Sequence, residues 1–394
     1  MQRRNFLRVS GGGFIAAATL APLASMGLSG CSPTMPESAV EAWKGPAPEL
    51  ANTDVRRWIL SYAILAPHAH NLQSWVVDLQ RDNEIVLRCD VKRLLPHTDP
   101  LSRQIMLSQG TFLELLDLAA KARGLRADIS LFPEGAHSAQ NVDARPVARI
   151  RLEPDASVQK DPLFAQALLR HTHRGAYDIG RPVPDAAWQT LTEAARAPGL
   201  RLGYVGSAQA AALDAHRKLA AQAWRIELTT PRTVMESYEL LRVGADEIAQ
   251  HRDGISLLDT KVVLLNRFGL LDRSTAPAAD AYATTSQISS FENNLATTPG
   301  FVWLTSTGND RITQVNAGRA YVRLQLAATA LGLSMHPLSQ ALQEYPEQRQ
   351  PYADAHALLG ATRPAETVQM WTRIGYAQPV TPSPRRRLGN FIQA

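Results

Sequence analysis

The chain has 394 residues, with 41 Lys or Arg, 36 Asp or Glu and a formal net charge of +5. Three positive charges, Arg3, Arg4 and Arg8, lie in an acid-free leader, so the rest of the chain carries 5 − 3 = +2. This near-neutral balance gives no reason to expect a nucleic-acid partner. Of the two cysteines, Cys31 and Cys89, the second lies in the apolar alternation IVLRCDV, which is typical of a packed strand thiol rather than a nucleophile.

Residues 1–31 are typical of an export leader. They begin with QRRNFLR, which resembles the twin-arginine signal read by the twin-arginine export machinery, and end with LSGC, which resembles a bacterial lipobox. A buried N-terminal helix is the alternative, but three consecutive glycines and Pro22 disfavour it. We therefore expect export to the periplasm or cell envelope, with a lipidated Cys31 as the only membrane contact.

Residues 32–52 have the composition of a Pro-rich tether with no packed face. The roughly 360 residues that follow the leader are enough for one large or two ordinary domains. They contain no apolar run long enough to span a bilayer.

Residues 53–155 alternate between helix and strand and form the first half of the expected fold. The pattern predicts a helix at 54–66, two paired strands in SWVVDLQ and EIVLRCD, and an amphipathic helix at 102–123 that ends at Gly124. RADISLF and PVARIRL supply two more strands.

Residues 156–394 repeat this order and form the second half. Helices at 185–197 and 311–331 accompany strands in LRLGYVG, GFVWLTST and TVQMWTRIGYA. The two α+β cycles predict an internally duplicated α+β fold, although the sequence identity between them is low. A helical insertion with a flexible middle, residues 207–296, is either a cover for the core or a lid over a site.

Two polar stretches carry candidate chemistry. APHAHNLQSW, residues 66–75, places hydrogen-bonding groups at a helix-to-strand corner, which is either a solvated turn or part of a ligand pocket. RHTHRGAYD places Arg170, Thr172 and Arg174 at alternate positions, so in extended backbone they converge on one anion, unless the segment is a solvated loop. The consecutive arginines 385–387 are either a basic tail or a further grip on the same phosphate.

Four motifs in order resemble the nitroreductase family. APHAHNLQSW resembles its Pro-Ser-Ser-x-Asn-x-Gln-Pro-Trp corner, and RHTHR resembles its Arg-Arg-Ser-x-Arg motif. NAGRAYVRLQLAATALGLSMHPLSQ resembles its long helix and following strand, and RIGYAQPVTPSPRRRL resembles its terminal strand and phosphate-binding end. With the export leader, the chain is most similar to the Acg-like subgroup, whose single chains mimic a nitroreductase dimer.

The resemblance implies a nitroreductase-like pseudo-dimer and a flavin mononucleotide (FMN) site shared between its halves. The first half carries the corner and lacks the arginine motif, whereas the second half carries the arginine motif and has only ARAPGLRLGYV in place of a corner. One complete FMN site per chain is therefore expected. The residues implied to bind FMN are Pro67, His68, Ala69, Asn71, Arg170, His171, Thr172, Arg174, Ser339, Arg385 and Arg386.

The corner departs from the family pattern at three positions. His68 and Ala69 replace two hydroxyl residues, and Ser74 replaces proline. The amides of Asn71 and Gln73 are retained and suit the polar edge of an isoalloxazine ring. His68 and His70 form an H-x-H pair, which can suggest a metal site. The sequence marks no third ligand, so no metal is expected.

The resemblance implies an exported FMN-dependent oxidoreductase that reduces a small electrophile, such as a nitro or quinone compound, by hydride transfer from the flavin. No side chain is assigned as catalytic. A non-enzymatic FMN-binding or flavin-sequestering protein is the alternative, because a covering insertion would exclude substrate. The substrate and the electron donor are left open, since NAD(P)H is scarce outside the cytoplasm.

Overall fold

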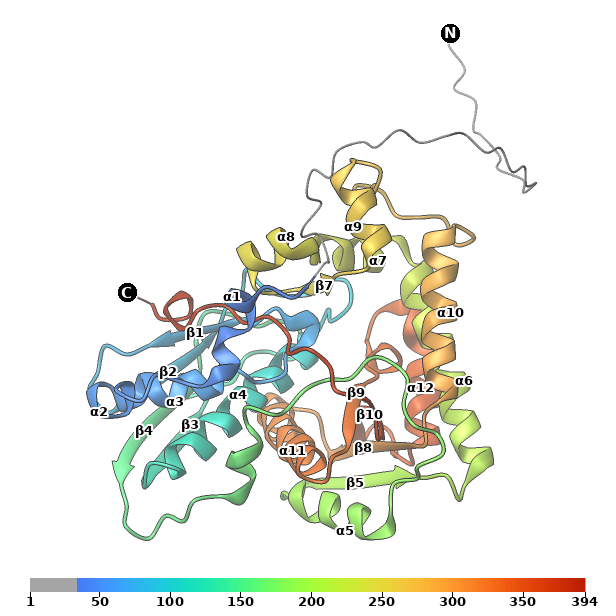
Figure 1. The fold of residues 1–394 in the computed structure, drawn as a ribbon. Helices are drawn as coiled ribbons and strands as arrows, with labels where there is room; N and C mark the ends of the chain where they lie inside the picture. The colour runs from blue at the N-terminus through green and yellow to red at the C-terminus, as the bar shows by residue number, and fades with distance from the viewer. Residues whose placement is uncertain (1–33, 394) are drawn as a thin grey trace, which may run out of the picture. The chain divides into compact units, whose positions relative to one another are not determined.

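Residues 34–393 are described by a computed structural model, in which the chain twice builds an antiparallel sheet with a long helix against it (Figure 1). The leader, including Cys31, lies outside the described residues, so export and lipidation stay predictions. No helix in the described part of the chain is long and apolar enough to cross a membrane.

The first half is a four-stranded sheet with order β1-β2-β4-β3, in which every neighbouring pair is antiparallel. Asp54 caps the first helix, because its carboxylate accepts the backbone N–H groups of Arg56 and Arg57. Gly124, with a φ of 67°, ends the long helix as the sequence predicts. The bounds are α3 Val55–Ala63, β1 Trp75–Asp78, β2 Glu84–Cys89, α4 Arg103–Lys121, β3 Leu125–Leu131 and β4 Pro146–Pro154.

The second half repeats this topology with strand order β5-β8-β10-β9, again fully antiparallel. Its elements are α5 Asp185–Ala194, β5 Leu200–Val205, β8 Gly300–Thr307, α11 Arg311–Ala330, β9 Ser334–Pro337 and β10 Glu366–Gly375. Each has a counterpart at the same place in the first half, both along the chain and across the sheet. The predicted duplicated α+β fold is confirmed.

The long helices of the two halves, α4 and α11, pack directly against each other. A Cβ at Gly110 of α4 would lie 1.9 Å from the carbonyl oxygen of Val315, and a Cβ at Gly318 of α11 would lie 1.9 Å from that of Leu107. Gly110 therefore faces Val315, three residues before Gly318. Gly318 in turn faces Leu107, three residues before Gly110. This reciprocal contact is what a pseudo-twofold axis between two duplicated helices produces.

The insertion between β5 and β8 is mostly helical. Its elements are α6 Ala210–Thr229, α7 Pro231–Glu239, β6 Leu241–Val243, α8 Gly244–His251, β7 Ile255–Leu257, α9 Thr260–Arg267 and α10 Tyr282–Ala296. The expectation of a flexible middle is wrong for its polar C-terminal part, which forms α10. Thr284, Ile288, Phe291 and Leu295 recur at helical spacing and are buried, so α10 has an apolar stripe that packs on α6.

The expectation that residues 32–52 have no packed face is also wrong for their middle part. Residues 37–44 form two short helical turns, α1 Glu37–Val40 and a 3₁₀ turn at Glu41–Lys44, and bury Ala39 and Trp43. The Trp43 indole donates from Nε1 to the carbonyl of Ser383 at 2.8 Å. One apolar ring with a polar edge is enough to anchor a segment that is otherwise polar.

The C-terminal segment returns to the first half after β10. Ile392 forms a parallel bridge with Val77 of β1, and Phe391 is buried against Trp75. The first core therefore contains residues from the far end of the chain. Cys89 is buried in β2, as its alternation predicts, and burial raises the pKa of its thiol to about 12.

Candidate functional site

The corner between α3 and β1 is a tight turn with left-handed backbone at three residues that are not glycine. His70, Asn71 and Gln73 have φ of 48°, 53° and 54°. Such conformations are unfavourable for most residues and persist where surrounding contacts hold them. The polar side chains of the corner provide many of these contacts.

His68 holds the turn from within. Its Nδ1 donates to the carbonyl of Ala69 (2.9 Å), and its Nε2 accepts the backbone N–H of Ser74 (3.1 Å) and lies 2.7 Å from the Ser74 hydroxyl. Burial lowers the pKa of His68 to about 3, so the ring is neutral. The backbone beside it is held by α4, because Thr111 donates to the Pro67 carbonyl and Ser108 accepts the Ala69 N–H.

The amides of Asn71 and Gln73 bind the C-terminal segment rather than facing open space. Asn71 Oδ1 accepts from Arg385 (2.8 Å), and its Nδ2 donates to the carbonyl of Pro384 (3.1 Å). Gln73 is fully buried; its Oε1 accepts the backbone N–H of Arg386, and its Nε2 donates to the carbonyl of Arg252 in the insertion, both at 2.9 Å. Protein groups therefore use both ends of each amide, and the predicted contact of these amides with a flavin ring stays a prediction.

Two arginines from distant parts of the chain meet beneath the corner. Arg170 and Arg385 are 3% and 2% exposed, and each donates from Nη2 to the Leu65 carbonyl, at 2.6 and 3.1 Å. Their guanidinium carbons lie 5.2 and 5.0 Å from the centroid of the Trp43 ring. The resemblance predicted that these arginines share one site, and the structure brings them together.

This arginine pair is electrostatically unbalanced. Burial lowers the pKa of Arg170 to about 10; burial, followed by the charge of Arg170, lowers that of Arg385 well below its usual value. Within residues 34–393, neither forms an ion pair with a carboxylate, and the Nε atoms of both are buried without a hydrogen-bond partner. The Leu65 carbonyl, which follows the negative end of α3, is only partial compensation. The pair is therefore a strong candidate for an anion site.

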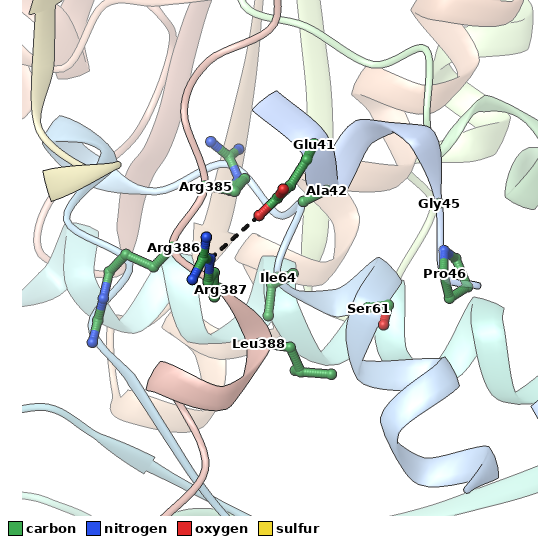
Figure 2. Close-up of a pocket in the computed structure, with 10 residues that line it drawn as sticks. All are labelled: Glu41, Ala42, Gly45, Pro46, Ser61, Ile64, Arg385, Arg386, Arg387 and Leu388. Carbon is green, nitrogen blue, oxygen red and sulfur yellow. Dashed lines mark ion pairs between the residues drawn. The ribbon is translucent and has the colours of Figure 1, made fainter. Parts of the chain in front are cut away.

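The three consecutive arginines at the C-terminus point in different directions (Figure 2). Arg385 enters the interior. Arg386 lies against the corner, with Nη1 3.3 Å from the Gln73 carbonyl and its guanidinium over the Phe391 ring. Arg387 is exposed and pairs with Glu41 at 3.5 Å across a surface pocket. Of the three, only Arg385 belongs to the buried pair.

Two of the remaining predicted residues, His171 and Thr172, follow Arg170 directly, and Ser339 lies just after β9. Gln325 of α11 accepts from Arg170 Nη1 (3.1 Å) and donates to the His171 carbonyl (3.0 Å) and, at 3.5 Å, to the Thr172 hydroxyl. The Nε2 atom of His171 is 3.1 Å from the Ser334 hydroxyl. Ser339 precedes a 3₁₀ turn, and its side chain makes no capping hydrogen bond there.

Arg174 lies close to polar residues of both halves. Its side chain is exposed, and desolvation lowers the pKa of its guanidinium. Its charge contributes to the lowered pKa values of His70 in the corner and His336 in β9. His70 Nε2 is in turn 3.5 Å from the Ser237 hydroxyl of α7.

Sequence reasoning missed three residues that support these groups. Trp43 was assigned to an unpacked tether, and Gln325 is one of several polar residues on a long helix. Arg373 of β10 is buried; it donates from Nε to His336 Nδ1 (3.0 Å) and from Nη2 to the carbonyls of Arg174 and Gly175. A lone tryptophan in a Pro-rich segment and an arginine in a buried strand were the available signals.

Comparisons with known proteins identify one class of relative. Two Mycobacterium tuberculosis proteins, named "Putative NAD(P)H nitroreductase MT3217" and "Putative NAD(P)H nitroreductase Rv3131", are 26% identical over 364 residues, which cover 89% of this chain and 95% of each relative. No family model matches the chain.

Solved structures named as nitroreductases are also similar to this chain. An FMN-dependent nitroreductase NfnB from Mycobacterium smegmatis, in complex with NADPH, is 18% identical with a TM-score of 0.37, and covers 57% of this chain and 94% of that one. A Bacteroides fragilis nitroreductase with bound FMN is 14% identical with a TM-score of 0.34, and covers 58% of this chain and 96% of that one.

Proposed function

We propose that this chain is an FMN-dependent oxidoreductase of the nitroreductase type that reduces small electrophilic compounds. The observation that carries the proposal is the buried pair of Arg170 and Arg385, two cations without a carboxylate partner among the described residues. The similarity over 89% of the chain to two mycobacterial proteins, each named "Putative NAD(P)H nitroreductase", supports the same conclusion.

The chemistry of these residues fits the phosphate of FMN. A phosphate brings two negative charges and several acceptor oxygens, and the orphaned Nε atoms of Arg170 and Arg385 are donors that lack an acceptor. Thr172 adds a hydroxyl close to Gln325, the residue that also holds Arg170. We propose that Arg174, further along the same segment, helps to hold the phosphate and ribityl end of the cofactor.

When bound, FMN would supply hydride transfer, and the chain would bind and orient the flavin. The corner would form one wall, with Asn71 and Pro67 held by the hydrogen bonds described above. No side chain of the chain is required to transfer the hydride itself.

The phosphate assignment is tested by comparing FMN with riboflavin, which lacks the phosphate. Arg385→Ala should weaken FMN binding by roughly tenfold to a hundredfold, equivalent to about 1.5–3 kcal/mol, and leave riboflavin affinity unchanged. Arg387→Ala, at a neighbouring arginine whose side chain is 67% exposed, is the matched control and should bind both as the parent does. If Arg385→Ala binds FMN as tightly as the parent does, Arg385 does not bind the phosphate.

The alternative function, a non-enzymatic protein that binds or sequesters flavin, is favoured by one observation. The insertion is hydrogen-bonded to the corner at three points. The Arg252 carbonyl accepts from Gln73, the Gly254 N–H donates to the Asn71 carbonyl at 3.2 Å, and the Ser237 hydroxyl lies 3.5 Å from His70 Nε2. A closed insertion would keep substrate out. Reduction of the bound flavin by a panel of donors, followed by reoxidation with nitro and quinone compounds, distinguishes the two functions.

We further propose that the protein acts outside the cytoplasm, on the basis of the leader alone. Twin-arginine export carries folded proteins, which suits a chain that captures FMN before it leaves. Replacing Arg3 and Arg4 by lysine should retain the precursor in the cytoplasm, and Cys31→Ala should abolish acylation and weaken the attachment of the protein to the membrane. Normal export of the Lys-Lys variant would contradict the twin-arginine route.

A further inference from the structure

The insertion carries an unusual concentration of exposed apolar side chains. Of the twelve large apolar residues that are exposed in the described part of the chain, five lie between residues 264 and 282. Leu264, Leu265, Phe268 and Leu270 are 46, 42, 71 and 70% exposed. Single exposed apolar residues are common, but four within one short segment indicate a surface that another phase or molecule covers. We call these four residues the α9 face.

The α9 helix has apolar side chains on two sides. Val262 and Val263 are partly buried, and Asn266 beside them donates from Nδ2 to Glu247 of α8 at 3.1 Å. Leu264, Leu265 and Phe268, which follows the last residue of α9, are exposed. The helix therefore packs on the protein through its valines and directs a second set of apolar side chains outward.

We propose that the α9 face rests on a lipid bilayer. Interfacial helices bury Phe and Leu side chains at the boundary between headgroups and acyl chains, and place basic residues among anionic headgroups. Lys261, in the first turn of α9, is exposed and suited to that second contact.

The start of the described chain and α9 both contact α8. Helix α1 contacts α8, and Glu41 pairs with Arg252, the residue that ends α8, at 2.6 Å. Cys31 is three residues before Thr34, so a lipid on Cys31 would attach within about 10 Å of Thr34 along an extended chain. This step rests on the proposed lipidation. A lipid there would bring α8 and α9 toward the membrane, and a second apolar contact strengthens an anchor.

The test uses the chain from Ser32 onward, which lacks Cys31 and includes the unit that is compact by itself, residues 33–394. It is mixed with vesicles of phosphatidylethanolamine and phosphatidylglycerol and sedimented. We expect the parent to bind without any lipid of its own, and Phe268→Glu with Leu270→Glu to lower the bound fraction by about tenfold or more.

A matched control replaces two apolar residues of similar exposure elsewhere. Ile179 and Ile312 are 56% and 46% exposed, and their Glu variants should bind vesicles as the parent does. The proposal is overturned if the parent does not bind vesicles, or if the control pair loses binding equally. It is also overturned if sedimentation equilibrium shows a dimer that the α9 variants dissociate, since the face then meets a second copy.

The vesicle result does not depend on lipidation. Mass spectrometry of the protein from the producing cell reports separately whether Cys31 carries acyl chains. An unmodified Cys31 would contradict the proposed anchor and leave the vesicle result unchanged.

Discussion

At the scale of single residues, the described chain buries arginines where most proteins bury ion pairs. Arg170, Arg385 and Arg373 are at most 3% exposed and donate to backbone carbonyls, amides or a histidine. A guanidinium stays charged when it is buried, so neutral acceptors offset only part of its lost hydration. For Arg170 and Arg385, which also repel each other, an anionic ligand would remove much of this cost.

The buried Gln73 amide should be a structural anchor rather than a ligand contact. Gln73→Leu would leave the Arg386 N–H and the Arg252 carbonyl without their partners in a buried place, at a cost of about 2–4 kcal/mol in the free energy of unfolding. Denaturant titration measures this loss. Limited proteolysis should also cut the C-terminal segment faster in the variant.

Gln80→Leu is the matched control, because Gln80 is exposed, at the end of β1. Its stability should lie within about 0.5 kcal/mol of the parent. If Gln73→Leu is as stable as Gln80→Leu, the amide does not hold the C-terminal segment.

Buried neutral histidines should make the protein sensitive to acid. Burial lowers the pKa values of His68 to about 3 and of His70, His216 and His356 to about 4, from an ordinary 6.5. Below the ordinary value, the unfolded chain binds more protons than the folded chain, so stability falls as pH decreases. Asp99 and Glu227, whose pKa values burial raises to about 6 and about 7, act in the opposite direction but are fewer.

As the pH falls from 6.5 to roughly 5, each of these histidines should lower the free energy of unfolding by about 1.5 kcal/mol. The two carboxyl groups raise it and offset part of the sum. We expect the free energy of unfolding to fall by roughly 3–5 kcal/mol over this range. Urea titrations at a series of pH values measure the slope. His356→Gln, which retains an acceptor for the Val368 N–H, should reduce the slope by about one histidine, and a pH-independent stability would contradict the account.

At the scale of elements, the contact between α4 and α11 determines how the halves are joined. Gly110→Ala or Gly318→Ala would place a methyl group against a carbonyl of the facing helix, at a distance no real contact adopts. The helices must separate, because a backbone carbonyl cannot rotate aside as a side chain can. Each substitution should lower the free energy of unfolding by about 3 kcal/mol or more. The midpoint temperature of thermal unfolding and the amount of flavin retained should fall together.

Gly389→Ala is the control for this pair, because an added Cβ there meets nothing within 4 Å. It should leave both measurements unchanged. A stable Gly110→Ala variant would show that the helices tolerate a wider spacing.

At the scale of the whole molecule, the halves are structurally interdependent. Val315, Val322 and Leu326 of α11 belong to the core of the first half, and Phe391 reaches the same core from the C-terminus. Neither half therefore contains all of its own core. The two polar motifs are divided in the same way, with Asn71 in one half and Arg174 in the other.

We expect one FMN per chain, and no retention of FMN by either half alone. Asn71→Ala, which removes an acceptor of Arg385, and Arg174→Ala should each weaken retention of FMN. Flavin absorbance after extraction, divided by protein concentration, gives the ratio. A ratio near two would refute the complementary loss of the second site, and a ratio near zero after reconstitution would refute the flavin proposal.

The helices and strands and their duplicated order could be predicted from the amino-acid sequence, because apolar periodicity and glycine positions act locally. The sequence also indicated Arg170 and Arg385 as candidate ligands, although they are far apart in the chain. The three-dimensional fold was needed to show that both arginines bind the Leu65 carbonyl, that Trp43 lies beside them, and that protein groups bind the Gln73 amide. These outcomes depend on which distant groups the fold brings within hydrogen-bond distance, and local patterns carry no information about that.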